Sequence, residues 1–307
     1  MTTSDEHAER FMLLRPLLFT IAYEILGSTT ESDDVLQDSY LRWAQVDLGG
    51  VHDTKSYLAR LVTRQALNTR RAGARRREDY VGPWLPEPLL LEEQDPSADV
   101  LLAESVSMAM LVLLETLGPD ERAVFVLREV FGFDYDEIAS AVGKSAAAVR
   151  QVAHRAREHV QARRRRFTPV DPEQNARITA QFMAAAATGD VEAVMAMLAP
   201  DVVWTADSGG KASAARRPVV GAEKVARAVV GLVGRAAQIP DVRVEMVMCN
   251  SAPAMLVYRA DFLEGVFTIE IIDGVITNFY AMRNPDKLTR LTTPHEISRG
   301  RTAKLVG

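Results

Sequence analysis

The chain has 307 residues, of which 48% are hydrophobic and 25% charged, and its formal net charge at pH 7 is −5. This length suits two or three domains, and the composition excludes a disordered or fibrous chain. No apolar run approaches the roughly 20 residues that span a bilayer, and the start MTTSDEHAER lacks the pattern of a signal peptide. The one cysteine, Cys249, excludes an intrachain disulfide and a cysteine-rich metal site. We therefore expect a cytoplasmic protein, not bound to membranes, that needs no metal or other cofactor.

The N-terminal segment predicts two helices. Leucine and isoleucine recur at helical spacing from residue 14 to residue 25, and Gly27 ends that run. A second helix over about residues 31–44 has an apolar stripe and an opposite face with Asp34, Gln37 and Asp38. Such a face is either a solvated surface or a contact for another protein, and the helix alone does not decide between them.

The next helix, predicted to begin at Thr54 with that hydroxyl as its cap, is strongly basic. Residues 55–77 contain eight Lys or Arg side chains and no acid. One face carries a polar stripe at helical spacing, made of Arg60, Arg64, Asn68 and Arg71. This stripe can follow a phosphate backbone, with Asn68 placed to contact a base. A merely solubilising face would usually alternate in charge, so contact with nucleic acid is the favoured interpretation.

The charge balance reverses between residues 78 and 137, which contain fifteen acidic side chains and two arginines. Three prolines surround Trp84 and Leu85, and they predict an extended segment because proline lacks an amide donor and fixes φ. A flexible tether explains the prolines and the acids. A tether seldom contains a tryptophan, so we expect Trp84 to dock into a groove of this protein or of a partner.

Residues 108–166 predict a helical domain that ends in a helix-turn-helix. One helix covers residues 108–117, the chain restarts at Pro119, and two further helices flank Gly143, whose left-handed turn joins them. In this motif the second helix enters the major groove with its outward side chains. Those side chains are Ser145, which also caps the helix, and Arg150, Gln151, His154 and Arg155. A hairpin that contacts only protein is the alternative.

The remainder predicts an α+β cone. Two helices and a short strand at 202–204 precede a helix at about 221–236, and four strands follow, at 242–249, 254–262, 265–272 and 275–282. Asp273 and Gly274 form a turn signal between the last two. The polar end of the chain, residues 291–307, has the composition of a disordered tail.

The order of these parts resembles a bacterial sigma factor of the extracytoplasmic-function type. ESDDVLQDSYLRWAQ is similar to region 2.2, SYLARLVTRQALNTRRAGARRR to regions 2.3 and 2.4, and LGPDERAVFVLREVFGFDYDEIASAVGKSAAAVRQVAHRARE to region 4. The resemblance implies that Asp34, Gln37 and Asp38 bind the clamp coiled coil of core RNA polymerase, whose flap contacts region 4. It implies that the stripe from Arg60 to Arg71 lies at the −10 promoter element and the outward helix-turn-helix residues at the −35 element. Ala148 and Val152 depart from the family pattern.

The C-terminal part resembles the SnoaL-like domain that extends one subgroup of these sigma factors. The motifs WLPEP (84–88), DSGGK (207–211) and NPDKL (284–288) carry this resemblance, although Ser208 replaces a usual glycine. They imply regulatory contacts within the chain. The residues implied are Trp84, Leu85, Pro86, Asp207, Gly209, Gly210, Lys211, Asn284, Pro285, Asp286 and Lys287.

We therefore expect a multidomain protein with two all-α domains and an α+β SnoaL-like cone. The expected segments are a region 2 domain (1–79), an acidic linker (80–107), a region 4 domain (108–167), a regulatory domain (168–290) and a tail (291–307). Two alternatives remain: a DNA-binding regulator with a ligand-sensing domain, and a SnoaL-like enzyme using Asp207, Asp261 or Glu270. No histidine lies between residues 171 and 294, which counts against the enzyme.

Overall fold

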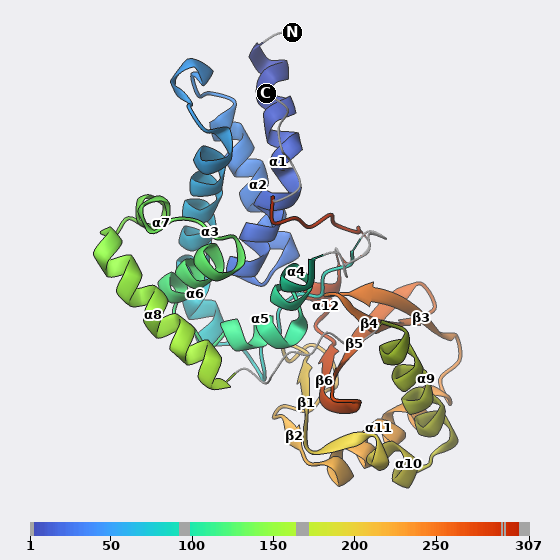
Figure 1. Cartoon of the computed structure of the whole chain (residues 1–307). Helices are drawn as coiled ribbons and strands as arrows, with labels where there is room; N and C mark the ends of the chain where they lie inside the picture. The colour runs from blue at the N-terminus through green and yellow to red at the C-terminus, as the bar shows by residue number, and fades with distance from the viewer. Residues whose placement is uncertain (1–2, 92–98, 164–171, 290, 292, 301–307) are drawn as a thin grey trace.

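Three helices form the N-terminal bundle of the computed structural model, which describes residues 3–91, 99–163, 172–289, 291 and 293–300. They are α1 (Thr3–Leu26), α2 (Thr29–Trp43) and α3 (Thr54–Glu78), with a 3-10 turn at Leu48–Gly50 (Figure 1). Ser28 caps α2 by accepting a hydrogen bond from the Glu31 amide. The predicted cap of α3 was wrong, because Asp53 and not Thr54 accepts hydrogen bonds from the amides of Lys55 and Ser56.

A second group of helices, which we call the helix-turn-helix domain, follows the connector of residues 80–107. The connector ends with α4 (Val100–Ser105). The domain contains α5 (Met108–Leu114), α6 (Pro119–Phe125), a π-helical turn (Val126–Val130), α7 (Tyr135–Val142) and α8 (Ala146–Arg163). Gly143 joins α7 to α8 with φ at 73°, and Ser145 accepts a hydrogen bond from the Ala148 amide. Both features confirm the predicted turn and cap.

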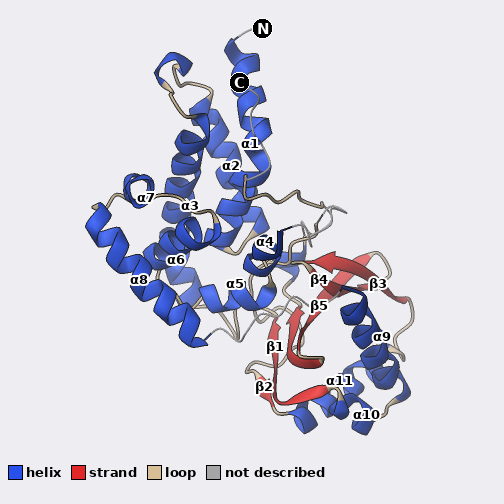
Figure 2. Ribbon diagram, in the orientation of Figure 1, coloured by secondary structure: helices blue, strands red, loops and turns tan. Residues whose placement is uncertain are grey.

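The C-terminal domain contains a six-stranded sheet. The elements of this domain are α9 (Pro172–Thr188), α10 (Val191–Ala196), β1 (Leu198–Asp207), β2 (Val219–Val220), α11 (Ala222–Ala236), β3 (Val242–Cys249), β4 (Ala252–Arg259), β5 (Phe262–Ile272), β6 (Val275–Met282) and α12 (Pro285–Leu288). Three of its helices, α9, α10 and α11, lie on the side of the sheet that faces away from the all-helical part of the chain (Figure 2). The strand order is β2-β1-β6-β5-β4-β3. The pairs from β3 to β6 are antiparallel, but β1 runs parallel to β6.

The N-terminal bundle and the helix-turn-helix domain share one apolar core. Buried side chains of α1 and α3, such as Leu18 and Leu58, belong to the same cluster as Leu111, Val124 and Val149. Helices α6 and α7 pack directly on α3. The two domains that the sequence predicts as separate units therefore lie against each other, with α3 between them.

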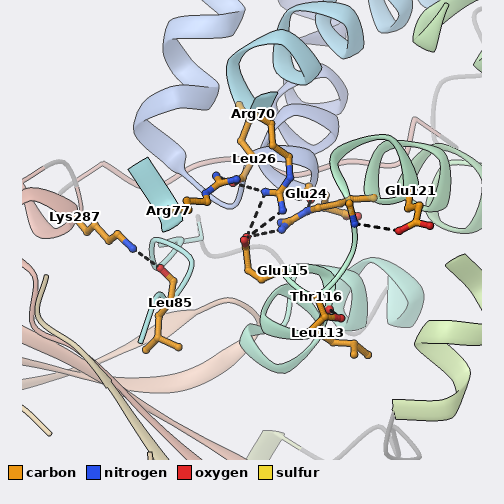
Figure 3. A network of polar contacts seen from close by, with 12 residues as sticks. Glu24, Leu26, Arg70, Arg77, Leu85, Leu113, Glu115, Thr116, Glu121 and Lys287 are labelled. Carbon is orange, nitrogen blue, oxygen red and sulfur yellow. Dashed lines mark hydrogen bonds and ion pairs between the residues drawn. The ribbon is translucent and has the colours of Figure 1, made fainter. Parts of the chain in front are cut away.

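A buried ionic network fixes this contact. The Glu115 carboxylate accepts hydrogen bonds from Arg122 at 2.5 Å and from Arg70 of α3 at 3.3 Å, and dashed lines in Figure 3 mark its contacts. Arg122 also donates to the carbonyl of Glu24, and Arg77 to that of Leu26. Burial alone would raise the pKa of Glu115, but the guanidinium groups of Arg122, Arg70 and Arg77 outweigh it and lower this pKa to about 2. The carboxylate therefore stays charged between its partners.

Glu24 of α1 is a second buried carboxyl group at this contact. It is fully buried, and Ser105 donates a hydrogen bond to one of its oxygens at 2.7 Å. The other oxygen has no hydrogen-bond partner among the described residues. Burial raises the pKa of Glu24 to about 8, because the charged form loses its hydration. At neutral pH the protonated form is therefore favoured in the folded protein.

Replacing Glu24 by glutamine removes this titration. The folded pKa lies above the ordinary value of 4.5, so stability is full below pH 4.5 and falls as pH rises toward 8. The free energy of unfolding of Glu24→Gln, relative to that of the wild type, should therefore increase by about 2–4 kcal/mol from pH 5 to pH 8.5. Urea unfolding across this pH range measures the difference, with the exposed Glu192→Gln as the control. Parallel curves for wild type and Glu24→Gln would contradict the assignment.

Candidate nucleic-acid interface

Helix α8 has the geometry of a recognition helix. Its inward residues Val149, Val152 and Ala156 are buried against the domain core. All five predicted contact residues at its outward side are exposed: Ser145, Arg150, Gln151, His154 and Arg155. The guanidinium of Arg150 lies 5.3 Å from the Tyr135 ring centroid, and His154 lies 3.5 Å from Glu158. This surface is presented to solvent and has the side chains that bind base edges and phosphates.

The predicted −10 residues of α3 are exposed, but the face that they form borders the helix-turn-helix domain. Arg60 donates to the Ser140 hydroxyl at 3.3 Å, and Arg64 to the Ser140 carbonyl at 3.1 Å. Further along α3, Arg71 donates to Asp120 of α6 at 2.5 Å, while Asn68 is exposed between these contacts. Three of the four predicted −10 residues thus make polar contacts with the other domain, although their side chains remain exposed.

The two predicted DNA surfaces approach each other at one point in this structure. Asp120 accepts a hydrogen bond from Arg71 and lies 3.0 Å from Lys144, which begins the turn into α8. One carboxylate thus joins a predicted −10 residue to a basic residue that immediately precedes the predicted −35 residues. Arg70, which the sequence pattern places in the same basic run, is buried in the network around Glu115 and not exposed at the helix surface.

The predicted protein-contact face of α2 is open. Asp34, Gln37 and Asp38 are exposed, and Leu41, one further turn along the same face, is 56% exposed. The neighbouring helix α1 exposes Met12 and Leu13. Large apolar side chains beside polar ones are typical of a surface that another protein covers. Sequence patterning did not single out these apolar residues.

The three short motifs meet at one junction between the connector and the C-terminal domain. The side chain of Asp207 is fully buried and accepts hydrogen bonds from the Leu85 amide at 2.8 Å, from Lys287 at 2.8 Å and from the Tyr80 hydroxyl. Lys287 also donates to the Leu85 carbonyl at 2.6 Å. Burial lowers the pKa of Lys287, and the Asp207 charge opposes that shift. The connector is therefore held by a buried ion pair.

Close packing explains the glycines of the second motif. Gly209 has φ at +56°, and a Cβ there would lie 2.7 Å from Asn284 and 2.9 Å from the Tyr80 hydroxyl. At Gly210, a Cβ would lie 3.2 Å from Val81. A larger side chain at Gly209 would force Asn284 and Tyr80 apart.

The rest of the motif residues surround this buried pair. Lys287 lies 3.3 Å from the centroid of the Trp84 ring, which packs edge-on against Tyr80. The sequence left open whether Trp84 docks into this protein or into a partner, and in the structure it docks within this protein. Pro86 is buried, Pro285 begins α12 after its cap Asn284, and Lys211 pairs with Asp286 at the surface.

Two residues that sequence reasoning missed complete the junction. The Glu87 carboxylate accepts hydrogen bonds from Ser28, Thr29 and Thr30 at the start of α2. Asn250, buried in the turn between β3 and β4, donates to the Tyr23 hydroxyl and to the Val106 carbonyl, both at 2.8 Å, and accepts from the Leu89 amide. A turn residue of the sheet domain thereby joins α1 to two separate points of the connector, at Leu89 and at Val106. The sequence contains only a turn signal at this position.

The carboxylates considered for catalysis do not share a site. Asp207 belongs to the junction, Asp261 is exposed at the turn between β4 and β5, and Glu270 accepts hydrogen bonds from Thr277 and Asn278. Within the described ranges, no three His, Cys, Asp or Glu side chains gather where they could hold a metal ion. None of the helices in the described part of the chain has the length and apolar character to cross a membrane.

A double-mutant cycle tests the buried pair. Asp207→Asn should destabilise the protein by about 3 kcal/mol, because it leaves the buried Lys287 without a counter-charge, and adding Lys287→Met should restore part of the loss. The exposed pair Lys211 and Asp286, changed to Met and Asn, is the matched control, with an expected coupling below about 1 kcal/mol. Thermal and urea unfolding measure both cycles. Equal coupling in the two pairs would refute the buried pair's role.

Comparisons with known proteins identify the same three domains along the chain. Family models match "Sigma-70 region 2" at residues 11–76, "Sigma-70, region 4" at 107–160 and "SnoaL-like domain" at 179–278. The chain is 38% identical over 290 residues to the ECF RNA polymerase sigma factor SigJ of Mycobacterium tuberculosis, covering 91% of this chain and 92% of that protein. It is 30% identical to the probable ECF RNA polymerase sigma factor SigI of the same species, covering 95% and 98%.

A solved structure shows the same fold along nearly the whole chain. The crystal structure of Mycobacterium tuberculosis SigJ aligns with a TM-score of 0.72 and 33% identity, covering 92% of this chain and 98% of that one. The predicted fold class, two helical sigma domains followed by an α+β SnoaL-like domain, is thereby confirmed. The chain belongs to the extracytoplasmic-function RNA polymerase sigma factors, and to those that contain a C-terminal SnoaL-like domain.

Proposed function

We propose that this sigma factor binds core RNA polymerase through α2 and directs it to promoters through α3 and α8. We call the arrangement with the helix-turn-helix domain packed against α3 the closed form, and we propose that it is inactive. The protein acts in the cytoplasm, where the polymerase is. The proposal that the closed form is inactive is supported by the contacts of α3, because Arg60, Arg64 and Arg71 all bind residues of the helix-turn-helix domain. A −10 element needs these groups for its phosphates and bases.

Opening requires a partner that binds the open form better than the closed form. The surface contacts of Arg60, Arg64 and Arg71 are individually weak, but the shared core and the Glu115 network are buried. Core polymerase supplies the differential binding, since its clamp and flap engage the two sigma domains at separate places. Promoter DNA adds to it by competing for the arginines of α3.

The C-terminal domain acts on this equilibrium through the connector. Asp207, Lys287 and Asn250 hold residues 80–89 in place, and Glu87 passes that restraint to the start of α2. With the connector held, the helix-turn-helix domain has less freedom to move away from α3. The C-terminal domain is therefore a regulator of opening and has no catalytic role.

Changing the open face of α2 tests polymerase binding. The variant with Asp34→Ala and Asp38→Ala, and separately Leu41→Ala, should weaken binding to core polymerase about tenfold or more, because anchoring residues dominate the binding energy of such interfaces. Glu192→Ala with Met195→Ala, an exposed acid and apolar residue on α10, is the control. Titration of labelled protein with core polymerase gives the Kd. Unchanged affinity in both α2 variants would instead favour a DNA-binding regulator that works without polymerase.

Releasing the α3 face tests the closed form. Asp120→Asn removes the charge that holds Arg71 and Lys144 together and should raise transcription about two- to fivefold, the effect of a partly exposed ion pair. Arg64→Ala with Asn68→Ala should lower transcription at least about tenfold by removing phosphate and base contacts. Asp136→Asn, exposed on α7, is the control.

These variants are compared by transcription with purified polymerase at equal protein concentration. A fall in output with Asp120→Asn, in protein that is folded by circular dichroism, would show that the closed contact supports activity. Normal output from the α3 double variant would remove α3 from promoter recognition.

A further inference from the structure

The end of the chain is not a free tail. The sequence predicts disorder over residues 291–307, and for residues 293–300 that prediction was wrong. These residues leave α12, run beside the connector and cross onto α1 (Figure 1). We call residues 293–300 the strap. Residues 301–307 lie outside the described part of the chain.

The first half of the strap docks on the N-terminal bundle. The His295 ring stacks on Phe19 with centroids 4.2 Å apart and planes 16° apart, and its Nε2 lies 3.1 Å from Asp33 of α2. The His295 amide donates to the Leu90 carbonyl of the connector. Further on, the Ser298 amide donates to the Thr20 hydroxyl of α1 at 3.0 Å. The strap therefore bridges α1, α2 and the connector.

Arg299 then reaches the other helical domain. Its side chain is 5% exposed. Its Nε donates to the carbonyl of Val130 at 2.7 Å, and its Nη1 donates to Asp99 at 2.9 Å. Val130 ends the π-helical turn that follows α6, and a cation at the carbonyl end of a helical segment is favourable. Asp99 also caps α4, at the end of the connector. One side chain thus ties the strap to the helix-turn-helix domain and to α4.

We propose that the strap is a releasable restraint that holds the helix-turn-helix domain closed against α3, and that Arg299 is the residue that fastens it. The inference rests on the proposed function for its consequence in transcription, and on the contacts above for its mechanics. A short segment with no helix or strand of its own can detach without unfolding any domain. Because it starts just after α12, which carries Lys287, the strap transmits the state of the junction to both sigma domains.

Two changes weaken the strap in the full-length chain. Arg299→Gln removes the charge that binds Asp99 and the Val130 carbonyl. Ser298→Pro removes the amide hydrogen that is donated to the Thr20 hydroxyl. Arg217→Gln, at an exposed arginine of the C-terminal domain, is the matched control. Spin labels at His52→Cys and Gln161→Cys, both exposed positions, report the distance from the N-terminal bundle to α8. The native Cys249 is fully buried and does not compete for label.

We expect the labelled parent and the Arg217→Gln control to show mainly the short distance of the closed form. Arg299→Gln should add a longer distance, with about a tenfold rise in the ratio of open to closed molecules, as expected on losing a hydrogen bond to a charged group. Ser298→Pro should add the same longer distance with a rise of about threefold, because the bond that it removes joins two neutral groups. Unchanged distance distributions in both variants would overturn the proposal. Asp99→Asn, which keeps the cap of α4 but removes the charge facing Arg299, should reproduce the effect of Arg299→Gln, and a closed distribution would count equally against it.

Transcription by the same samples separates this inference from the proposed function. If the longer distance appears and transcription rises, both stand. If it appears without a rise in transcription, the strap is a restraint but the closed form is not inactive. If distances stay unchanged while Asp120→Asn raises transcription, the strap proposal fails and the proposed function stands.

Discussion

The closed arrangement depends on one carboxylate, Glu115, held between two buried guanidinium groups. Arg122 comes from its own domain, whereas Arg70 comes from α3. A buried ion pair adds little stability compared with an apolar contact, but losing one partner is costly because it leaves an unpaired charge. The network therefore makes the contact between the two sigma domains specific in position. Apolar packing supplies most of the stabilisation, and Glu115 determines where α5 and α6 lie on α3.

The same network explains why closure and activity oppose each other. Arg70 and Arg71 are adjacent on α3. Arg70 binds Glu115, whose side chain is only 16% exposed, while Arg71 binds Asp120 at the surface. Any movement that frees the exposed stripe for DNA must also break or stretch the buried pairs. A partner that favours the open form therefore has to offset the full cost of separating the domains. Core polymerase, as a large partner with two separated contacts, is suited to this, whereas a promoter hexamer alone offers few contacts.

Local structure was largely predictable because it depends on local rules. The spacing of Val149, Val152 and Ala156, the left-handed Gly143 and the capping Ser145 all act within a few residues, and each was found as predicted. The resemblance brought together the three motifs, although it did not reveal that Asp207 and Lys287 form a buried pair. The sites at polymerase and promoter stay predictions, since the structure shows only where their residues lie.

Contacts between distant segments could not be predicted, because the residues that make them look like surface residues in the sequence. Arg70 belongs to a basic run, Glu115 and Arg122 to an acidic segment, and nothing in their spacing indicates that they become buried together. Asn250 and Glu87 likewise have only local signals, for a turn and an acidic linker. His295 and Arg299 occur in a polar tail whose composition predicts disorder. In each case tertiary packing buries the side chain, and local composition does not indicate which side chains this will be.

The junction and the strap differ in a way that gives them an order of release. At the junction, Asp207 and Lys287 are both buried, and Asn250 satisfies three backbone and side-chain partners beside them, so separation there would leave charged groups unpaired. The strap is held by a few separate contacts along a segment without helix or strand, and Asp99, the partner of Arg299, is one-third exposed, so water can reach the contact of Arg299 with Asp99 first. Release should therefore begin at Arg299 and proceed back toward His295, while the connector remains gripped. The C-terminal domain can in this way stay attached to the connector in both the closed and the open form, and its influence on opening need not end when the strap is released.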